Sequence, residues 1–265
     1  MILIAILLGL LEGVTEFLPI SSTGHLIVGG HLLGFTGPVA SSFEIFIQLG
    51  AILAVVWVYR RHLGSVAAGA FRRDPDPDAW RLLRNLAISF APAGVVGLLF
   101  HGFIQEHLFG PLTVAGSLVV GGVAMIVIER ARPEGGVDSI MRISWSMAFA
   151  VGCAQALALF PGVSRAAATI MGGMVSGLNR KTATEFSFYL AIPTMFAATL
   201  YDLLRSWSVL SVDELAPFAV GFVMAFASAL LAVRGLLRFI SRHDFQAFGW
   251  YRIVFGGFVA AYFLL

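Results

Sequence analysis

Two short polar segments interrupt the long apolar runs of this chain and hold most of the side chains that could do chemistry. The first segment reads Glu12-Gly-Val-Thr-Glu16-Phe-Leu-Pro19-Ile-Ser21-Ser22-Thr23-Gly24-His25. Glu12 and Glu16 are four residues apart, so on a helix they share one face. Pro19 disfavours helical geometry in the residue before it and ends that helix. The hydroxyl residues that follow are typical N-caps, which predicts a second helix beginning near Gly24.

The second segment has the same design. It reads Phe160-Pro161-Gly162-Val163-Ser164-Arg165-Ala-Ala-Ala-Thr169. The Pro-Gly pair stops one helix, and Ser164 caps the next. Arg165 brings a permanently charged, planar set of N–H donors that suits phosphate oxygens, and Thr169 lies one helical turn further on.

These groups together predict an anion site. The free N–H groups at the start of a helix attract negative charge, and both segments place such a start beside hydroxyl groups. If the two segments meet, Arg165 and the side chain of His25 converge with these hydroxyls on one phosphate. We expect the substrate to be bound by Ser21, Thr23, Gly24, Ser164 and Thr169.

The paired carboxylates need a positive partner beside a phosphate. A divalent cation, Mg²⁺ or Ca²⁺, held by Glu12 and Glu16 would remove the repulsion between these groups and the substrate. In the alternative, one of the two carboxyl groups is protonated and acts as an acid.

Composition places these segments in a membrane protein. Of the 265 residues, 58% are hydrophobic and 12% are charged, whereas soluble domains are about half apolar and a quarter charged. The lone cysteine, Cys153, excludes an intramolecular disulfide. The apolar start, residues 1–11, has no basic region and no small-residue cleavage site, so we expect no cleavable signal peptide.

Six apolar runs are long enough to cross a bilayer, which takes about 20 helical residues. They lie at about 40–59, 84–105, 108–128, 185–204, 215–237 and 245–265. We expect Arg252, near the start of the last run, to reach the membrane interface with its long side chain. Residues 1–35 and 143–178 are apolar but broken in the middle. Irregular backbone at membrane depth is tolerated only inside protein, which predicts two re-entrant helix–loop–helix hairpins.

Arginine placement orients the chain. The segment from Tyr59 to Arg84 holds six arginines, and such loops lie in the cytoplasm. The loops that follow alternate in basic content without contradiction. We therefore expect both termini on the outer side of the cytoplasmic membrane.

The two broken regions belong to an internal repeat. Pro19, Ser22, Gly29-Gly30 and Glu44 match counterparts 141 to 143 residues further on, including Pro161 and Ser164. Each copy contains one hairpin and three spans, so the second copy must be upside down relative to the first. The predicted fold is an all-α polytopic membrane protein with six transmembrane helices and two re-entrant hairpins. It forms a single membrane domain over residues 1–265, with repeats at about 1–130 and 143–265.

The two motifs resemble those of the undecaprenyl-diphosphate phosphatase family linked to bacitracin resistance, and the similarity runs over essentially the whole chain. The resemblance implies hydrolysis of undecaprenyl diphosphate to the monophosphate, which recycles the carrier lipid for cell-wall synthesis. It also implies that the active site opens to the outer face of the cytoplasmic membrane. It carries over these residues: Glu12, Glu16, Ser22, His25, Ser164, Arg165 and Thr169. One departure is Ala166, where the family usually has serine, so the second motif has one hydroxyl fewer.

Two mechanisms stay open at this point. Either Ser22 attacks the terminal phosphorus while His25 or Glu16 takes its proton, or His25 itself attacks. Arg165 stabilises the transferred phosphoryl group in both. The competing class is a lipid-phosphate transporter or flippase, which shares the inverted-repeat architecture; a non-catalytic lipid-binding subunit is a third. The expected partners are a polyprenyl diphosphate and membrane lipid, without nucleic acid, and the sequence leaves open whether the chain forms a homodimer.

Overall fold

The described residues of the chain fold mainly into helices. The structure is a computed structural model that describes residues 1–108, 110–131, 135–206 and 214–264. Within these ranges there is no β-sheet, and the only bridge joins Val137 to Leu178. The helices are α1 (Ile2–Thr15), α2 (Ser22–Leu32), α3 (Pro38–Ala70), α4 (Pro77–His107), α5 (Pro111–Ala131), α6 (Trp145–Ala156), α7 (Arg165–Val175), α8 (Arg180–Ser206), α9 (Leu215–Ile240) and α10 (Gln246–Leu264).

Five of these helices are long and apolar enough to cross a membrane. They are α3, α4 over Pro77–Phe100, α5, α9 and α10. The run at 185–204, which the sequence predicts as a sixth span, lies in α8, a 27-residue helix outside this group of five. An all-helical chain with several helices of membrane-spanning length is a multi-pass membrane protein.

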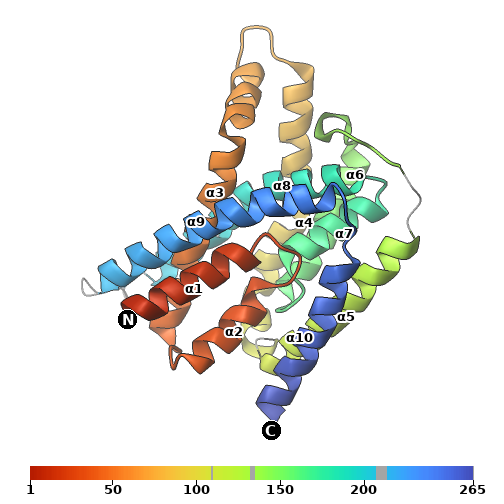
Figure 1. The fold of residues 1–265 in the computed structure, drawn as a ribbon. Coiled ribbons are helices and arrows are strands. Elements are labelled where there is room, and N and C mark those ends of the chain that lie inside the picture. The colour runs from red at the N-terminus through yellow and green to blue at the C-terminus, as the bar shows by residue number, and fades with distance from the viewer. Residues whose placement is uncertain (109, 132–134, 207–213, 265) are drawn as a thin grey trace.

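The arginine-rich segment at 59–84 is mostly helical, not a loop. α3 continues to Ala70 and α4 begins at Pro77, so the two helices extend beyond the rest of the molecule as a hairpin (Figure 1). The chain turns only where Asp76 caps α4 with its carboxylate, ahead of Pro77 in the first turn. Because no proline interrupts the chain between Tyr59 and Ala70, the basic segment stays helical outside the apolar run.

The two broken apolar regions form helical hairpins with matching backbones. α2 and α7 each have 11 residues, and their N-caps, Ser21 and Ser164, share a positive φ, 72° and 71°. Their C-termini also match, since Phe35 N–H donates to the Gly30 carbonyl as Leu178 N–H donates to that of Gly173. The structural partner of Ser164 is therefore Ser21, one residue before the Ser22 that sequence comparison aligns with it.

Each hairpin packs on a helix from the other half of the chain. α1 lies along α9, where a Cβ on Gly9 would come within 2.4 Å of the Gly221 carbonyl oxygen (Figure 1). α6 lies along α4 in the same way, and a Cβ on Gly152 would come within 2.6 Å of the Ser89 carbonyl oxygen. Gly9 and Gly152 occupy equivalent positions in their hairpins, so glycine allows both close helix crossings.

α5 and α10 form an antiparallel pair. Gly122 lies against Gly249, and Ala115 lies against Gly256 at the other end of the pair. Arg252, which the sequence places at the membrane interface, is instead fully buried in α10, at 0% exposure. The interface expectation for this arginine is wrong, because carbonyl groups inside the protein receive its N–H donors.

A buried ion pair fixes one end of this helix pair. Arg180, at the start of α8, lies 2.5 Å from Glu129 near the end of α5. The second carboxylate oxygen of Glu129 accepts the backbone N–H of Phe245, which precedes α10. One acidic side chain thus joins the ends of three helices.

Candidate active site

The two hairpin turns meet at one pocket. The first hairpin contributes Glu16, Ser21, Ser22 and Thr23, and the second contributes Ala158, Leu159, Pro161, Gly162, Ser164 and Arg165. Gln48 of α3 and Thr194, Met195 and Ala198 of α8 complete the lining. The pocket therefore lies between the starts of α2 and α7, where the first N–H groups of each helix have no partner within the helix.

Both turns place a capping serine in an unfavourable backbone conformation. Ser21 accepts the N–H of Gly24, and Ser164 accepts the N–H of Ala167 at 3.2 Å. Among the described residues, these two are the only non-glycine residues with positive φ. Such geometry costs of order 1–3 kcal/mol and persists where function requires it. The two strained serines therefore lie at the helix starts that border the pocket.

Ser22 and Glu16 form a hydroxyl–carboxylate pair. The Ser22 hydroxyl donates to Glu16 Oε2 at 2.5 Å, and both side chains are buried. A carboxylate at this distance can accept the hydroxyl proton during attack on an electrophile, because general-base catalysis requires direct hydrogen-bond contact.

Arg165 joins the second hairpin to this pair. Its Nη2 lies 3.2 Å from Glu16 Oε1, and Nη1 donates to the carbonyl oxygen of Ser187 at 3.1 Å. The guanidinium also lies over the Phe17 ring, 5.5 Å from its centroid. Nε is buried and has no hydrogen-bond partner. Arg165 therefore lines the pocket with one donor unsatisfied, and groups from two segments, the first hairpin turn and α8, orient its guanidinium.

His25 lies outside the pocket lining, on the side facing α10. Its Nδ1 donates to the Ser21 carbonyl at 2.7 Å, which leaves Nε2 to accept the Tyr251 hydroxyl at 2.6 Å. Phe255 stacks on the imidazole with ring centroids 4.2 Å apart. Both ring nitrogens are occupied, so the geometry favours Glu16 over His25 as the partner of Ser22.

Three further residues predicted from the sequence also lie behind the pocket lining. The Thr169 hydroxyl is buried and contacts the Ser187 hydroxyl at 2.7 Å as well as the Arg165 carbonyl. Gly24 faces α5 and α10, where an added Cβ would come within 3.3 Å of Leu118 and 3.5 Å of Phe255. Glu12 is 1% exposed, and its Oε2 has no hydrogen-bond partner. These residues surround the groups that line the pocket.

The surroundings of Glu12 indicate whether the site is suited to a divalent cation. No cluster of three or more His, Cys, Asp or Glu side chains suited to a metal occurs in the described ranges. Mg²⁺ nevertheless often binds through one or two carboxylates plus substrate phosphates. An orphaned buried carboxylate oxygen on Glu12, one turn from Glu16, fits that donor set.

Sequence reasoning missed several residues at the site. Gln48 and Thr194 line the pocket as isolated polar residues within apolar runs. Ser187, which contacts both Arg165 and Thr169, follows Glu185 in the second repeat. Isolated polar residues inside a membrane helix are the signal that could have identified them.

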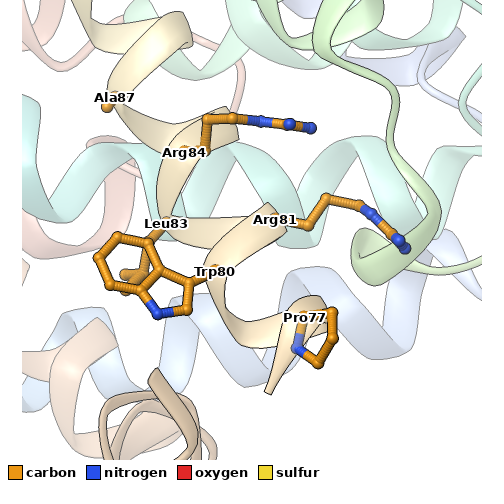
Figure 2. A pocket seen from close by; sticks show the side chains of 6 residues that line it. All are labelled: Pro77, Trp80, Arg81, Leu83, Arg84 and Ala87. Atoms are coloured by element: carbon orange, nitrogen blue, oxygen red, sulfur yellow. The ribbon is translucent and has the colours of Figure 1, made fainter. Parts of the chain in front are cut away.

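A second hollow lies on α4, away from these groups. It is lined by Pro77, Trp80, Arg81, Leu83, Arg84 and Ala87 (Figure 2). All six residues come from the basic end of one helix, and none belongs to the predicted site. The chemistry is therefore concentrated between the two hairpin turns.

The fold and the pocket define a class of protein. The pocket brings together a hydroxyl–carboxylate pair, a guanidinium and two helix N-termini inside a multi-pass membrane protein. These groups are typical of a membrane-embedded enzyme that acts on phosphate. The chain belongs to the bacitracin resistance protein BacA family, whose model matches residues 5–258.

Relatives of known name agree with this membership. The chain is 52% identical to the undecaprenyl-diphosphatase of Methylobacillus flagellatus, over 99% of this chain and 98% of the relative. It is 53% identical to the undecaprenyl-diphosphatase of Aromatoleum aromaticum, over 97% and 93%. It is also 53% identical to undecaprenyl-diphosphatase 2 of Rhodospirillum rubrum, over 98% and 94%. The family expected from the two sequence motifs is confirmed.

Proposed function

We propose that this protein hydrolyses undecaprenyl diphosphate to undecaprenyl phosphate and phosphate, with Ser22 as the nucleophile. The observation that carries the mechanism is the Ser22–Glu16 hydrogen bond in a pocket shared with Arg165. The names of relatives about 52% identical over nearly the whole chain support the substrate. A lipid transporter needs no such nucleophile–base pair, so the pocket argues against that alternative.

The reaction takes place in two balanced steps. Glu16 accepts the hydroxyl proton as Ser22 Oγ bonds to the terminal phosphorus, and the phosphoanhydride bond breaks to release undecaprenyl phosphate. Water then attacks the phosphorus of the phosphoserine, the bond from phosphorus to Ser22 Oγ breaks, and protonated Glu16 gives its proton back to Oγ. The released phosphate carries the oxygen and protons of the water. Glu16 first acts as a base and is regenerated in the second step.

Arg165 and the two helix N-termini stabilise the phosphoryl group during both steps. Substrate oxygens replace Glu16 as partners of the guanidinium, and the unpartnered Nε adds a further donor. The starts of α2 and α7 both border this pocket. Fixed donors of this kind act strongly where water is excluded.

A divalent cation completes the substrate site in this proposal. Glu12 and Glu16 would hold Mg²⁺ or Ca²⁺ together with phosphate oxygens, and the cation when bound would neutralise charge on the diphosphate. Glu12 has no other partner for its Oε2. Ser164 would contact the phosphate directly, whereas Thr169 would orient Arg165 through Ser187.

The proposed membrane arrangement has six spans and two re-entrant hairpins. α8 serves as the sixth span, and α1–α2 and α6–α7 enter from opposite faces as parts of repeats at about 1–130 and 143–265. The matching hairpin backbones and the antiparallel α5–α10 pair support an inverted repeat. In this proposal both termini and the pocket opening lie on the outer side of the cytoplasmic membrane; arginine placement supports this for the termini, and the family resemblance supports it for the opening. There the enzyme recycles the carrier lipid for cell-wall synthesis and protects against bacitracin.

Phosphate release from the purified protein tests this function. Detergent-solubilised enzyme with undecaprenyl diphosphate should release one phosphate for each undecaprenyl phosphate formed. Translocation of intact diphosphate across liposomes, without phosphate release, would instead identify a transporter.

A further inference from the structure

Arg252 occupies an unusual position for a charged residue in a membrane helix. It lies in α10 and is wholly buried, where a charged side chain is costly unless other charges or backbone carbonyls pair with it. No acidic side chain accepts a hydrogen bond from it in the described ranges; its partners there are backbone carbonyls.

Each of the five N–H donors of this guanidinium has a carbonyl acceptor. Nη1 donates to Pro19 at 3.3 Å and to Val163 at 2.9 Å. Nη2 donates to Gly162 at 3.1 Å and to Ser117 at 3.2 Å, and Nε donates to Leu118 at 3.4 Å. The set is fully satisfied by three separate segments.

The acceptors are placed where the active site is built. Pro19 lies in the first hairpin turn, three residues before Ser22. Gly162 and Val163 lie in the second turn, immediately before Ser164 and Arg165. The carbonyls of α5 anchor the guanidinium itself. One side chain therefore connects both turns to a common support.

We propose that Arg252 is a positioning residue that sets the spacing of the two hairpin turns, and with it the spacing of Ser22 and Arg165 on one phosphate. Packing α10 against α5 does not require a cation, since an apolar side chain would avoid the cost of burying charge. A planar fork with five donors is needed to hold carbonyls on both turns, and lysine, with one nitrogen, lacks that geometry. This inference rests on the proposed roles of Ser22 and Arg165.

Gly121 supplies an independent way to disturb Arg252. A Cβ on Gly121 would lie 2.3 Å from Arg252 Nη2, so Gly121→Ala pushes the guanidinium without changing any charge. Gly116, on the same helix, has no atom within 4 Å of its added Cβ. Gly116→Ala is therefore a matched control for an alanine in α5.

The experiment compares Arg252→Lys, Gly121→Ala, Gly116→Ala and Arg165→Lys with the wild type. It measures kcat and KM for undecaprenyl diphosphate per folded molecule, together with inhibition by inorganic phosphate. We expect Arg252→Lys and Gly121→Ala to lower kcat by about tenfold or more, because small misplacements of reacting groups are costly to rate. KM should change less than about threefold, since the lipid chain still binds, and inhibition by phosphate should weaken. Gly116→Ala should match the wild type.

Two outcomes would overturn the positioning role of Arg252, and a third would refute the proposed phosphate site. Wild-type kcat in both Arg252→Lys and Gly121→Ala would overturn the positioning role. A loss explained entirely by less folded protein, with normal kcat per folded molecule, would also overturn it. Should Arg252→Lys fail to fold, Gly121→Ala alone decides. Wild-type activity in Arg165→Lys would instead refute the proposed phosphate site, which separates the two failures.

Discussion

Ser22 Oγ lies 2.5 Å from Glu16 Oε2, although the two residues are six apart in sequence. On a continuous helix residues six apart point in different directions and do not meet. They meet here because α1 ends at Thr15 and α2 begins at Ser22, with the Pro19 turn between them. The broken helix is thus what creates the nucleophile–base pair.

Replacing Ser22 by alanine should nearly abolish phosphate release. Removal of a nucleophile typically lowers kcat by roughly a thousandfold or more. Ser41→Ala, an exposed serine on α3, serves as the control and should retain full activity. Steady-state kinetics on both variants provide the check, and substantial turnover by Ser22→Ala would rule out a phosphoserine.

Replacing Arg165 by lysine should lower kcat by roughly a hundredfold or more, since lysine retains the charge but loses the planar fork. The exposed Arg234 offers a matched control, and Arg234→Lys should behave as the wild type. Circular dichroism and size-exclusion profiles should show both variants folded. If Arg165→Lys works normally, the second hairpin does not bind the phosphate.

His25→Gln should reduce activity far less than Ser22→Ala. Both nitrogens of His25 are hydrogen-bonded, to the Ser21 carbonyl and the Tyr251 hydroxyl, so the ring supports the turn. Mass spectrometry of rapidly quenched enzyme should find the transferred phosphoryl group on Ser22. A phosphorylated His25 would reverse the assignment of the nucleophile.

Glu12 should account for binding of a divalent cation. Mg²⁺ or Ca²⁺ should raise the thermal unfolding midpoint of the wild type, because ligands of the folded state stabilise it. Glu12→Gln should remove most of that shift, and EDTA should abolish wild-type turnover. Full turnover in EDTA, with no thermal shift, would leave Glu12 an acid or a structural residue.

The strained cap at Ser164 predicts an order of stability. Ser164→Ala loses the cap, worth about 0.5–2 kcal/mol, and keeps the positive φ. Ser164→Gly costs only a few tenths of a kcal/mol (roughly 0.3) in capping and relieves the strain. Thermal unfolding should therefore rank Gly above Ala, while both lose activity with the hydroxyl. The reverse order of unfolding temperatures would contradict the backbone strain.

Local sequence signals were sufficient for the membrane character and the hairpins. α1 ends at Thr15, four residues before Pro19, and the 3-10 turn after α6 ends at Leu159, two residues before Pro161; Ser164 caps α7 as predicted. These are interactions within a few residues, which type and spacing determine. The family also followed from the sequence, because the two motifs together are specific to it.

Long-range contacts could not be predicted in the same way. The position of Arg252, near the start of an apolar run, is typical of an interface residue. Its carbonyl partners lie on both hairpin turns and on α5, and the sequence does not show that these segments meet around it. His25 was expected at the phosphate, yet Tyr251, 226 residues away, binds its ring. The sequence repeat paired Ser22 with Ser164, whereas the structural partner of Ser164 is Ser21, one residue earlier. The sequence alignment was off because proline stands at a different distance from the capping serine in the two turns.

The close crossing of α1 and α9 has a consequence for biosynthesis. The ribosome makes α1 first, but its packing partner at Gly221 emerges only near the end of translation. The first hairpin must therefore wait, incompletely packed, while the intervening helices insert. A chain stopped before Leu215 should leave a cysteine at Ala5 open to labelling in membranes, whereas the full-length chain should protect it. Protection in the truncated chain would mean that another partner shelters α1 during synthesis.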